Sequence, residues 1–163
     1  LFQLYERQPQ IRVFDCIALT HGGSGDLLTE RMVNTIKNKY PNSEYVAYPD
    51  ATGHKRGSSA MYSDIDLLVK GGFKVKAMKT SPLVIDRVNA VNKALQGNLV
   101  IDPSCKDLIQ DLEKTSNKEG TREIDKSNKN LTHMSDALGY AVHWELPIIK
   151  PTLGSIRRIW YQT

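Results

Sequence analysis

Long apolar segments and cysteines are what this sequence has least of. No apolar run in its 163 residues approaches the ~20 residues that a membrane-spanning helix needs. The start of the chain is too mixed and polar to resemble a signal peptide. The two cysteines, Cys16 and Cys105, lie far apart in the sequence and match no metal-ligand spacing. These absences argue against a membrane protein and favour a reducing compartment.

Several motifs of catalysis are missing as well. The four histidines show none of the paired spacings of zinc ligands, and nothing in the sequence supports thiol catalysis. Residues 22–25 supply the glycines of a phosphate-binding loop but not its lysine. We therefore expect neither zinc chemistry nor ATP hydrolysis from this chain. An initiator methionine is also absent, so we expect the chain to begin partway through a strand.

What is present fits one folded domain with a core. Hydrophobic residues make up 40% of the chain and charged residues 25%, which is ordinary for a globular protein. The net charge is +4, and the basic residues cluster between Lys70 and Lys93 and again near the C-terminus. Such clusters favour an acidic partner such as nucleic acid, although a solvated basic face gives the same pattern.

Periodicity predicts alternating strands and helices. The predicted strands span residues 1–6, 11–19, 45–48, 73–78 and 99–101, and the predicted helices span about residues 26–40, 63–70, 81–95, 105–115 and 133–144. An initial hairpin followed by this alternation indicates a mixed α/β sheet covered by helices. Residues 116–130 are predicted to form a loop or hairpin. The domain covers residues 1–146, and residues 147–163 form an irregular tail with two prolines.

Local signals place the helix ends and faces. Ser63 and Asp66 predict a capping box for the second helix, and Ser81 and Pro82 are predicted at the N-cap and first position of the third. The inward residues of the third helix are predicted as Val84, Val88, Val91 and Leu95, and those of the fourth as Leu108, Ile109 and Leu112.

The stretch around Asp50 is the first candidate for chemistry. Asp50 follows the 45–48 strand and precedes a loop with Gly53, Lys55 and Arg56. An acid at a strand end beside two cations suggests a metal-bound reaction on a polyanion, because site residues concentrate in such loops. The alternative is that Asp50 only caps a turn.

The last helix carries a polar stripe. His133, Asp136, Tyr140 and His143 are spaced i, i+3, i+7 and i+10, which puts them on one face. One interpretation is that Asp136 only interacts with the helix dipole, which stabilises an acid in the first turn by about 0.3–1 kcal/mol. Asp136 can also join Asp50 in binding Mg²⁺ or Mn²⁺, which prefer oxygen ligands. His133 is a candidate ligand, proton shuttle or phosphate contact, or has no role. Tyr140 and His143 are expected to be packing or solvent groups.

Five segments together resemble a known family. They are Tyr48-Pro-Asp-Ala-Thr-Gly53, Ser63-Asp-Ile-Asp-Leu-Leu68, Gly71-Gly-Phe73, Asp86-Arg-Val-Asn-Ala-Val91 and Thr132-His-Met-Ser-Asp-Ala-Leu-Gly-Tyr-Ala-Val142. Their order and content resemble the C-terminal nuclease domain of the large terminase subunit of tailed bacteriophages. The resemblance covers most of the chain, from about Tyr5 to Trp144.

The resemblance implies a ribonuclease H-like mixed sheet flanked by helices on both faces and an endonuclease that cuts concatemeric double-stranded DNA during packaging. It also implies a two-metal mechanism, with the two ions about 3.5–4 Å apart. Asp50 and Asp136 match two acids of the family's metal site, and His133 matches a histidine that some members place beside the metals. The family's first-strand acid has no match, and Asp15 is not expected to replace it. We therefore expect weak or no nuclease activity from this chain alone.

The family also implies partners and a location. We expect DNA contacts from Lys55, Arg56, Lys79 and Lys129. The implied partners are an N-terminal ATPase domain of the same full-length protein, the terminase small subunit and the portal protein. The implied location is the host bacterial cytoplasm, transiently at the procapsid portal. Two alternatives stay open: a related ribonuclease H-like transposase or resolvase, and a catalytically inactive DNA- or portal-binding module.

Overall fold

The fold is taken from a computed structural model, which describes residues 1–5, 10–20, 28–54, 61–121, 123–125, 127–128 and 131–148. The predicted DNA contacts Lys55, Arg56 and Lys129 and nearly all of the predicted tail, residues 149–163, lie outside these ranges. Along the chain the elements are β1 (Phe2–Tyr5), β2 (Gln10–Val13), α1 (Leu28–Lys39), β3 (Val46–Ala47), the 3-10 helix η1 (Ala51–His54), α2 (Asp64–Lys70), β4 (Lys74–Val75), α3 (Val84–Ala94), β5 (Leu99–Ile101), α4 (Lys106–Lys114) and α5 (His133–Glu145).

The strands of the described residues form two small sheets. In the first, β1 pairs antiparallel with β2, and β2 pairs parallel with β5, so that Ile11 lies opposite Leu99. In the second, β3 pairs parallel with β4. The predicted mixed α/β class is confirmed, and the mixed pairing lies within the β1-β2-β5 sheet. The strands predicted at 11–19 and 73–78 are much shorter than predicted.

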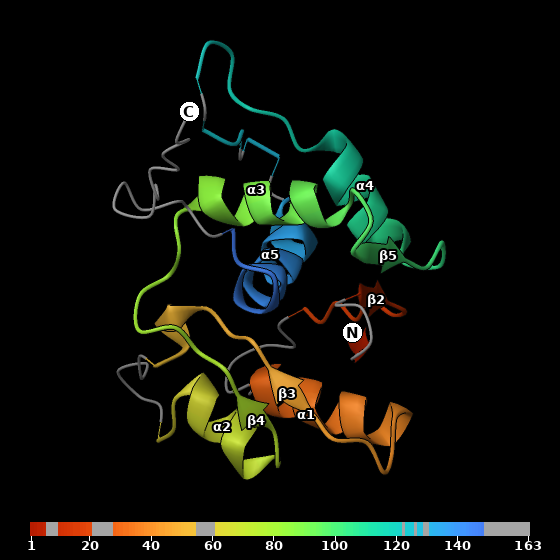
Figure 1. Cartoon of the computed structure of the whole chain (residues 1–163). Coiled ribbons are helices and arrows are strands. Elements are labelled where there is room, and N and C mark those ends of the chain that lie inside the picture. Colours follow the sequence, from red (N-terminus) through yellow and green to blue (C-terminus); the bar gives the residue numbers. More distant parts are fainter. Residues whose placement is uncertain are drawn as a thin grey trace, which may run out of the picture.

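Two clusters of buried side chains hold the molecule together. The larger cluster joins the first sheet to α3, α4 and α5, with Ile11 and Val142 fully buried at its centre. The smaller one joins α1 to the chain around β4, where Phe73 packs with Val33 and Ile36. Figure 1 shows the matching arrangement, with α3, α4 and α5 in the upper half and α1, α2, β3 and β4 in the lower half. The candidate residues therefore come from both halves.

The local signals at α2 were read correctly. The Asp66 amide donates to Ser63 Oγ at 3.2 Å, and the Ser63 amide donates to Asp66 Oδ2 at 2.9 Å, which confirms the predicted capping box. The 116–130 segment is a hairpin where it is described, with a bridge between Asn117 and Ile124.

The prediction for α3 was wrong in its start and at Leu95, whereas Val91 is buried as predicted. The helix begins at Val84, and Ser81 does not cap it, because the Ser81 hydroxyl donates to Asp50 Oδ1 instead. The buried residues are Arg87, Ala90, Val91 and Ala94, whereas Leu95 is 44% exposed. The inward face is rotated because a charged residue, Arg87, points toward α5 rather than toward solvent.

Candidate functional site

The start of α5 is fixed by an acid from another helix. Asp111 of α4 is buried, and its carboxylate accepts hydrogen bonds from the backbone amides of Thr132 at 2.6 Å, Met134 at 2.9 Å and Ser135 at 3.0 Å. Thr132, at the N-cap, has a φ of 80° and makes no capping bond through its own side chain. Asp111 therefore satisfies the amides that the first turn of a helix leaves unpaired.

Sequence reasoning missed Asp111, although a signal was present. Leu108, Asp111 and Leu112 share one face of α4, and an acid within an apolar face indicates a buried polar partner. The partner itself lies 21 to 24 residues further along the chain, so the sequence did not identify it.

Asp136 pairs with a buried arginine of α3. Arg87 Nη1 lies 2.8 Å from Asp136 Oδ1, and the guanidinium carbon lies 4.3 Å from the centre of the Tyr140 ring. The close approach of α3 and α5 depends on Gly139, where a Cβ atom would lie 3.3 Å from Arg87 Cβ. The interpretation that Asp136 interacts only with the helix dipole is therefore incomplete, because its carboxylate also neutralises the buried Arg87 cation.

Asp50 lies three residues after β3, directly before η1. Its Oδ1 accepts from the Ser81 hydroxyl and, at 3.0 Å, from the Thr52 amide, which makes it a turn cap as one reading expected. The hydrogen bond from Ser81 lowers the pKa of Asp50 below its ordinary value, the Thr52 amide and Tyr140 hydroxyl act in the same direction, and partial burial opposes them. Asp50 is therefore ionised at neutral pH.

Tyr140 connects the two carboxylates. Its ring stacks under Arg87, and its hydroxyl lies near Asp50 and Ser81, where it helps to lower the pKa of Asp50. Burial raises the pKa of Tyr140, so the hydroxyl stays protonated and can donate. The predicted packing role of Tyr140 agrees with its ring contact to Arg87, and its hydroxyl also lies near Asp50. A single chain of contacts runs from Asp50 through Tyr140 and Arg87 to Asp136, and we call these four residues the carboxylate network.

The other predicted site residues lie outside the carboxylate network. His133 is exposed at the first position of α5, and Lys79 is exposed two residues before Ser81. Asp15 faces α1 instead, where its carboxylate accepts from Lys39 at 2.8 Å and Tyr40 at 2.6 Å.

The donor chemistry of the network suits a hard divalent cation, since Asp50 and Asp136 offer carboxylate oxygens. Among the described residues, however, no group of three or more histidine, cysteine, aspartate or glutamate side chains is arranged to hold a metal ion. Asp50 and Asp136 alone supply fewer oxygen ligands than such an ion takes. The described residues do not complete a two-ion site.

A second polar contact joins the two halves near Asp50. Glu145, the last residue of α5, accepts hydrogen bonds from Lys76 Nζ at 2.6 Å and from the Tyr48 hydroxyl. Tyr48 belongs to the segment between β3 and Asp50, and its ring also contacts Phe2, with centroids 5.5 Å apart. This contact fixes the end of β3 against α5, and with it the position of Asp50.

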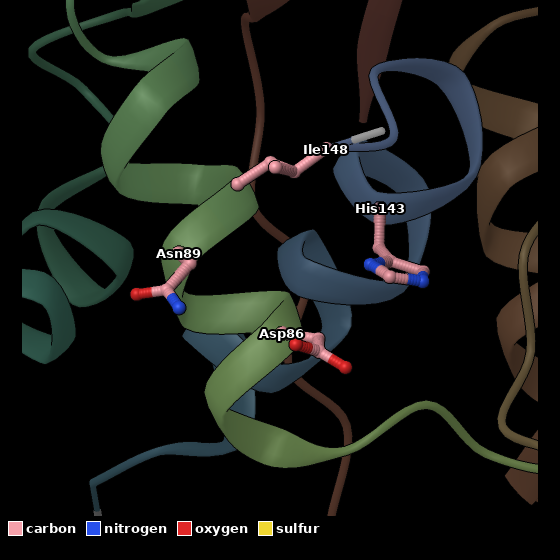
Figure 2. Close-up of a pocket in the computed structure, with 4 residues that line it drawn as sticks. All are labelled: Asp86, Asn89, His143 and Ile148. Atoms are coloured by element: carbon pink, nitrogen blue, oxygen red, sulfur yellow. The ribbon is translucent and has the colours of Figure 1, made fainter. Parts of the chain in front are cut away.

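A cavity of about 300 Å³ lies between α3 and the end of α5, and no residue of the carboxylate network lines it. Figure 2 shows its lining residues: Asp86 and Asn89 from α3, His143 from the end of α5, and Ile148 from the segment after α5. Within the described part of the chain, the buried Nδ1 of His143 has no hydrogen-bond partner. Neither Asp50 nor Asp136 lines this cavity, so we do not assign the candidate chemistry to it. The carboxylate network remains the candidate site.

Comparisons of the chain with protein-family models, with curated proteins and with solved structures found no match. The helices of the described residues are all too short or too polar to pass through a lipid bilayer.

Proposed function

We propose that this chain is the metal-dependent nuclease domain of a terminase large subunit and that it acts on double-stranded DNA through Asp50 and Asp136. The observation that carries the proposal is the carboxylate network, which joins an acid at a strand end to an acid at a helix start. The mixed β1-β2-β5 pairing supports a ribonuclease H-like sheet as part of the same proposal.

Asp50 and Asp136 would hold Mg²⁺ or Mn²⁺, with the two-ion arrangement completed by a ligand outside the described residues. Bound ions of this kind activate a water molecule and stabilise the charge on the leaving oxygen. The residues of this chain prepare the ligands: Ser81 and Tyr140 keep Asp50 ionised and oriented. Asp111 fixes the helix turn that carries Asp136.

His133 and Lys79 are proposed to act on the DNA. His133 lies almost one turn before Asp136 and is exposed, which suits a proton shuttle or a phosphate contact. Lys79 is exposed and lies two residues before Ser81, which contacts Asp50. This position suits a contact with the phosphates of the DNA backbone. Lys55, Arg56 and Lys129 are proposed as further phosphate contacts on sequence grounds alone.

The resemblance supports the wider context as a proposal. In the full-length protein this domain would follow an ATPase domain and work with the small terminase subunit and the portal protein. Its place would be the cytoplasm of the host bacterium, transiently at the procapsid portal.

Metal binding provides the direct test. Asp50→Asn and Asp136→Asn should each weaken Mn²⁺ binding about tenfold, because each removes one charged ligand from a site with few ligands. Binding is measured by electron paramagnetic resonance of free Mn²⁺, and plasmid nicking with and without EDTA is followed in parallel. Asp107→Asn, at an exposed acid of α4, is the matched control and should leave the affinity unchanged. Equal Mn²⁺ affinity in all four proteins would remove Asp50 and Asp136 from the metal site.

A catalytically inactive DNA-binding module is the second candidate. It is favoured by the pairing of Asp136 with Arg87 and by the lack of a third ligand among the described residues. DNA binding that is unchanged by EDTA, together with no detectable Mn²⁺ binding, would favour this module over the nuclease.

Lys79→Ala should weaken binding to double-stranded DNA uniformly across sequences and reduce the slope of log affinity against log salt by about 1. The physical reason is the loss of one phosphate contact and the counterion it releases. Fluorescence anisotropy over a salt series measures both quantities. Lys106→Ala, at an exposed lysine that begins α4 and lies outside the basic cluster, is the control. An unchanged slope for Lys79→Ala would place Lys79 outside the DNA contact.

A further inference from the structure

Arg87 is placed unlike an ordinary surface cation. Its side chain is 6% exposed, and that of its partner Asp136 is 28% exposed. The guanidinium also lies over the Tyr140 ring, with 4.3 Å between its central carbon and the ring centre. Among the residues that the structure describes, the buried Nε of Arg87 has no hydrogen-bond partner. The salt bridge and the ring are therefore the main compensation for a buried charge.

A guanidinium and a divalent ion would both bind the negatively charged carboxylate of Asp136. Arginine stays charged when buried, so Arg87 requires a nearby anion, and Asp136 Oδ1 supplies it at 2.8 Å. A metal ion at this carboxylate would meet a like charge in a partly water-excluded setting, where repulsion is stronger than in water. Full pairing with Arg87 and full ligation of a metal are therefore in competition.

We propose that Arg87 holds the Asp136 carboxylate in the metal-free protein and that a divalent ion displaces it, so that Arg87 sets the metal affinity of the site. This inference rests on the proposed function, in which Asp136 is a metal ligand. The Tyr140 ring gives the displaced guanidinium a second place to bind, because a cation over an aromatic face remains stabilised after losing its anion. Arg87 is a positioning residue in this scheme.

The test compares Arg87→Met and Arg87→Lys with the wild-type chain. Methionine keeps much of the apolar volume and removes the charge, whereas lysine keeps the charge without the planar guanidinium. Mn²⁺ affinity is measured by electron paramagnetic resonance, and metal-free stability by thermal unfolding. We expect Arg87→Met to bind Mn²⁺ about tenfold more tightly than wild type while its metal-free form melts at a lower temperature. Arg87→Lys should fall between the two proteins in both quantities.

A second readout uses the wild-type chain. Diamagnetic Mg²⁺ should shift the Nε–H resonance of Arg87 in a ¹⁵N correlation spectrum, because the guanidinium leaves Asp136. No shift at a Mg²⁺ concentration that saturates the site would overturn the proposal, even if Arg87→Met fails to fold.

The outcomes separate this inference from the proposed function. If Arg87→Met binds Mn²⁺ as wild type does, or more weakly, the competition is wrong and the ion pair is structural. If Asp136→Asn nevertheless weakens Mn²⁺ binding, the proposed metal site is retained. If Asp136→Asn binds Mn²⁺ as tightly as wild type, the metal site itself is wrong, and the inference about Arg87 is overturned with it.

Discussion

Replacing Asp111 with alanine should lower the free energy of unfolding by about 3 kcal/mol, because three backbone amides lose a charged acceptor at once. The amides belong to Thr132, Met134 and Ser135, and the carboxylate that serves them is 2% exposed. For a chain of this length the loss corresponds to a fall in melting temperature of roughly 6–12 °C. Urea denaturation followed by circular dichroism measures the free energy directly.

Two variants sharpen this test. Asp111→Asn keeps one accepting oxygen without the charge and should lose roughly half as much stability. Glu113→Ala removes an exposed acid from the same helix and should change stability by less than about 0.5 kcal/mol. If Asp111→Ala and Glu113→Ala behave alike, the first turn of α5 does not depend on Asp111.

Replacing Glu145 with alanine should lower the free energy of unfolding by about 2 kcal/mol. The change leaves the Tyr48 hydroxyl and Lys76 without their shared acceptor. Lys76 is 39% exposed, so solvent screens part of its contribution, and the loss is smaller than for Asp111. Tyr48→Phe removes only one of the two bonds and should lose about 1 kcal/mol, measured in the same urea titrations.

The contribution of Glu145 should also depend on pH with a defined sign. Burial raises the pKa of Glu145, but the hydrogen bonds from Lys76 and Tyr48 outweigh it and leave the pKa below the ordinary value of 4.5. A carboxyl with a lowered folded pKa stabilises the protein above its unfolded pKa and loses that effect as the pH falls through the folded value. The stability difference between wild type and Glu145→Gln should therefore be constant from about pH 6 to 8 and shrink below about 4.5.

The difference in stability between wild type and Glu145→Gln also separates the effect of Glu145 from that of the other acids. Asp50 and Asp15 have lowered pKa values too, through Ser81 and Lys39 respectively, but both are present in wild type and in Glu145→Gln and cancel in the comparison. A difference that stays constant down to pH 3 would show that the Glu145 contact does not depend on its charge.

Local signals predicted the helices well because each signal acts within one turn. The capping box of Ser63 and Asp66 spans three residues, and the buried face of α1 with Val33 and Ile36 follows from helical spacing. The strands were predicted too long because ladder length depends on the neighbouring strand. After Val13 the chain leaves the ladder, and Asp15 turns toward α1.

The sequence by itself determined which residues have the chemistry for a site: Asp50 at a strand end and Asp136 at a helix start. Only the tertiary structure decided how they are connected. The hydrogen bonds from Ser81 to Asp50, from Arg87 to Asp136 and from Thr132 to Asp111 span 31, 49 and 21 residues. Apolar periodicity predicts that a charged residue such as Arg87 or Asp111 faces solvent. These residues are buried because partners on another helix or loop compensate their charges, and the sequence pattern does not show those partners.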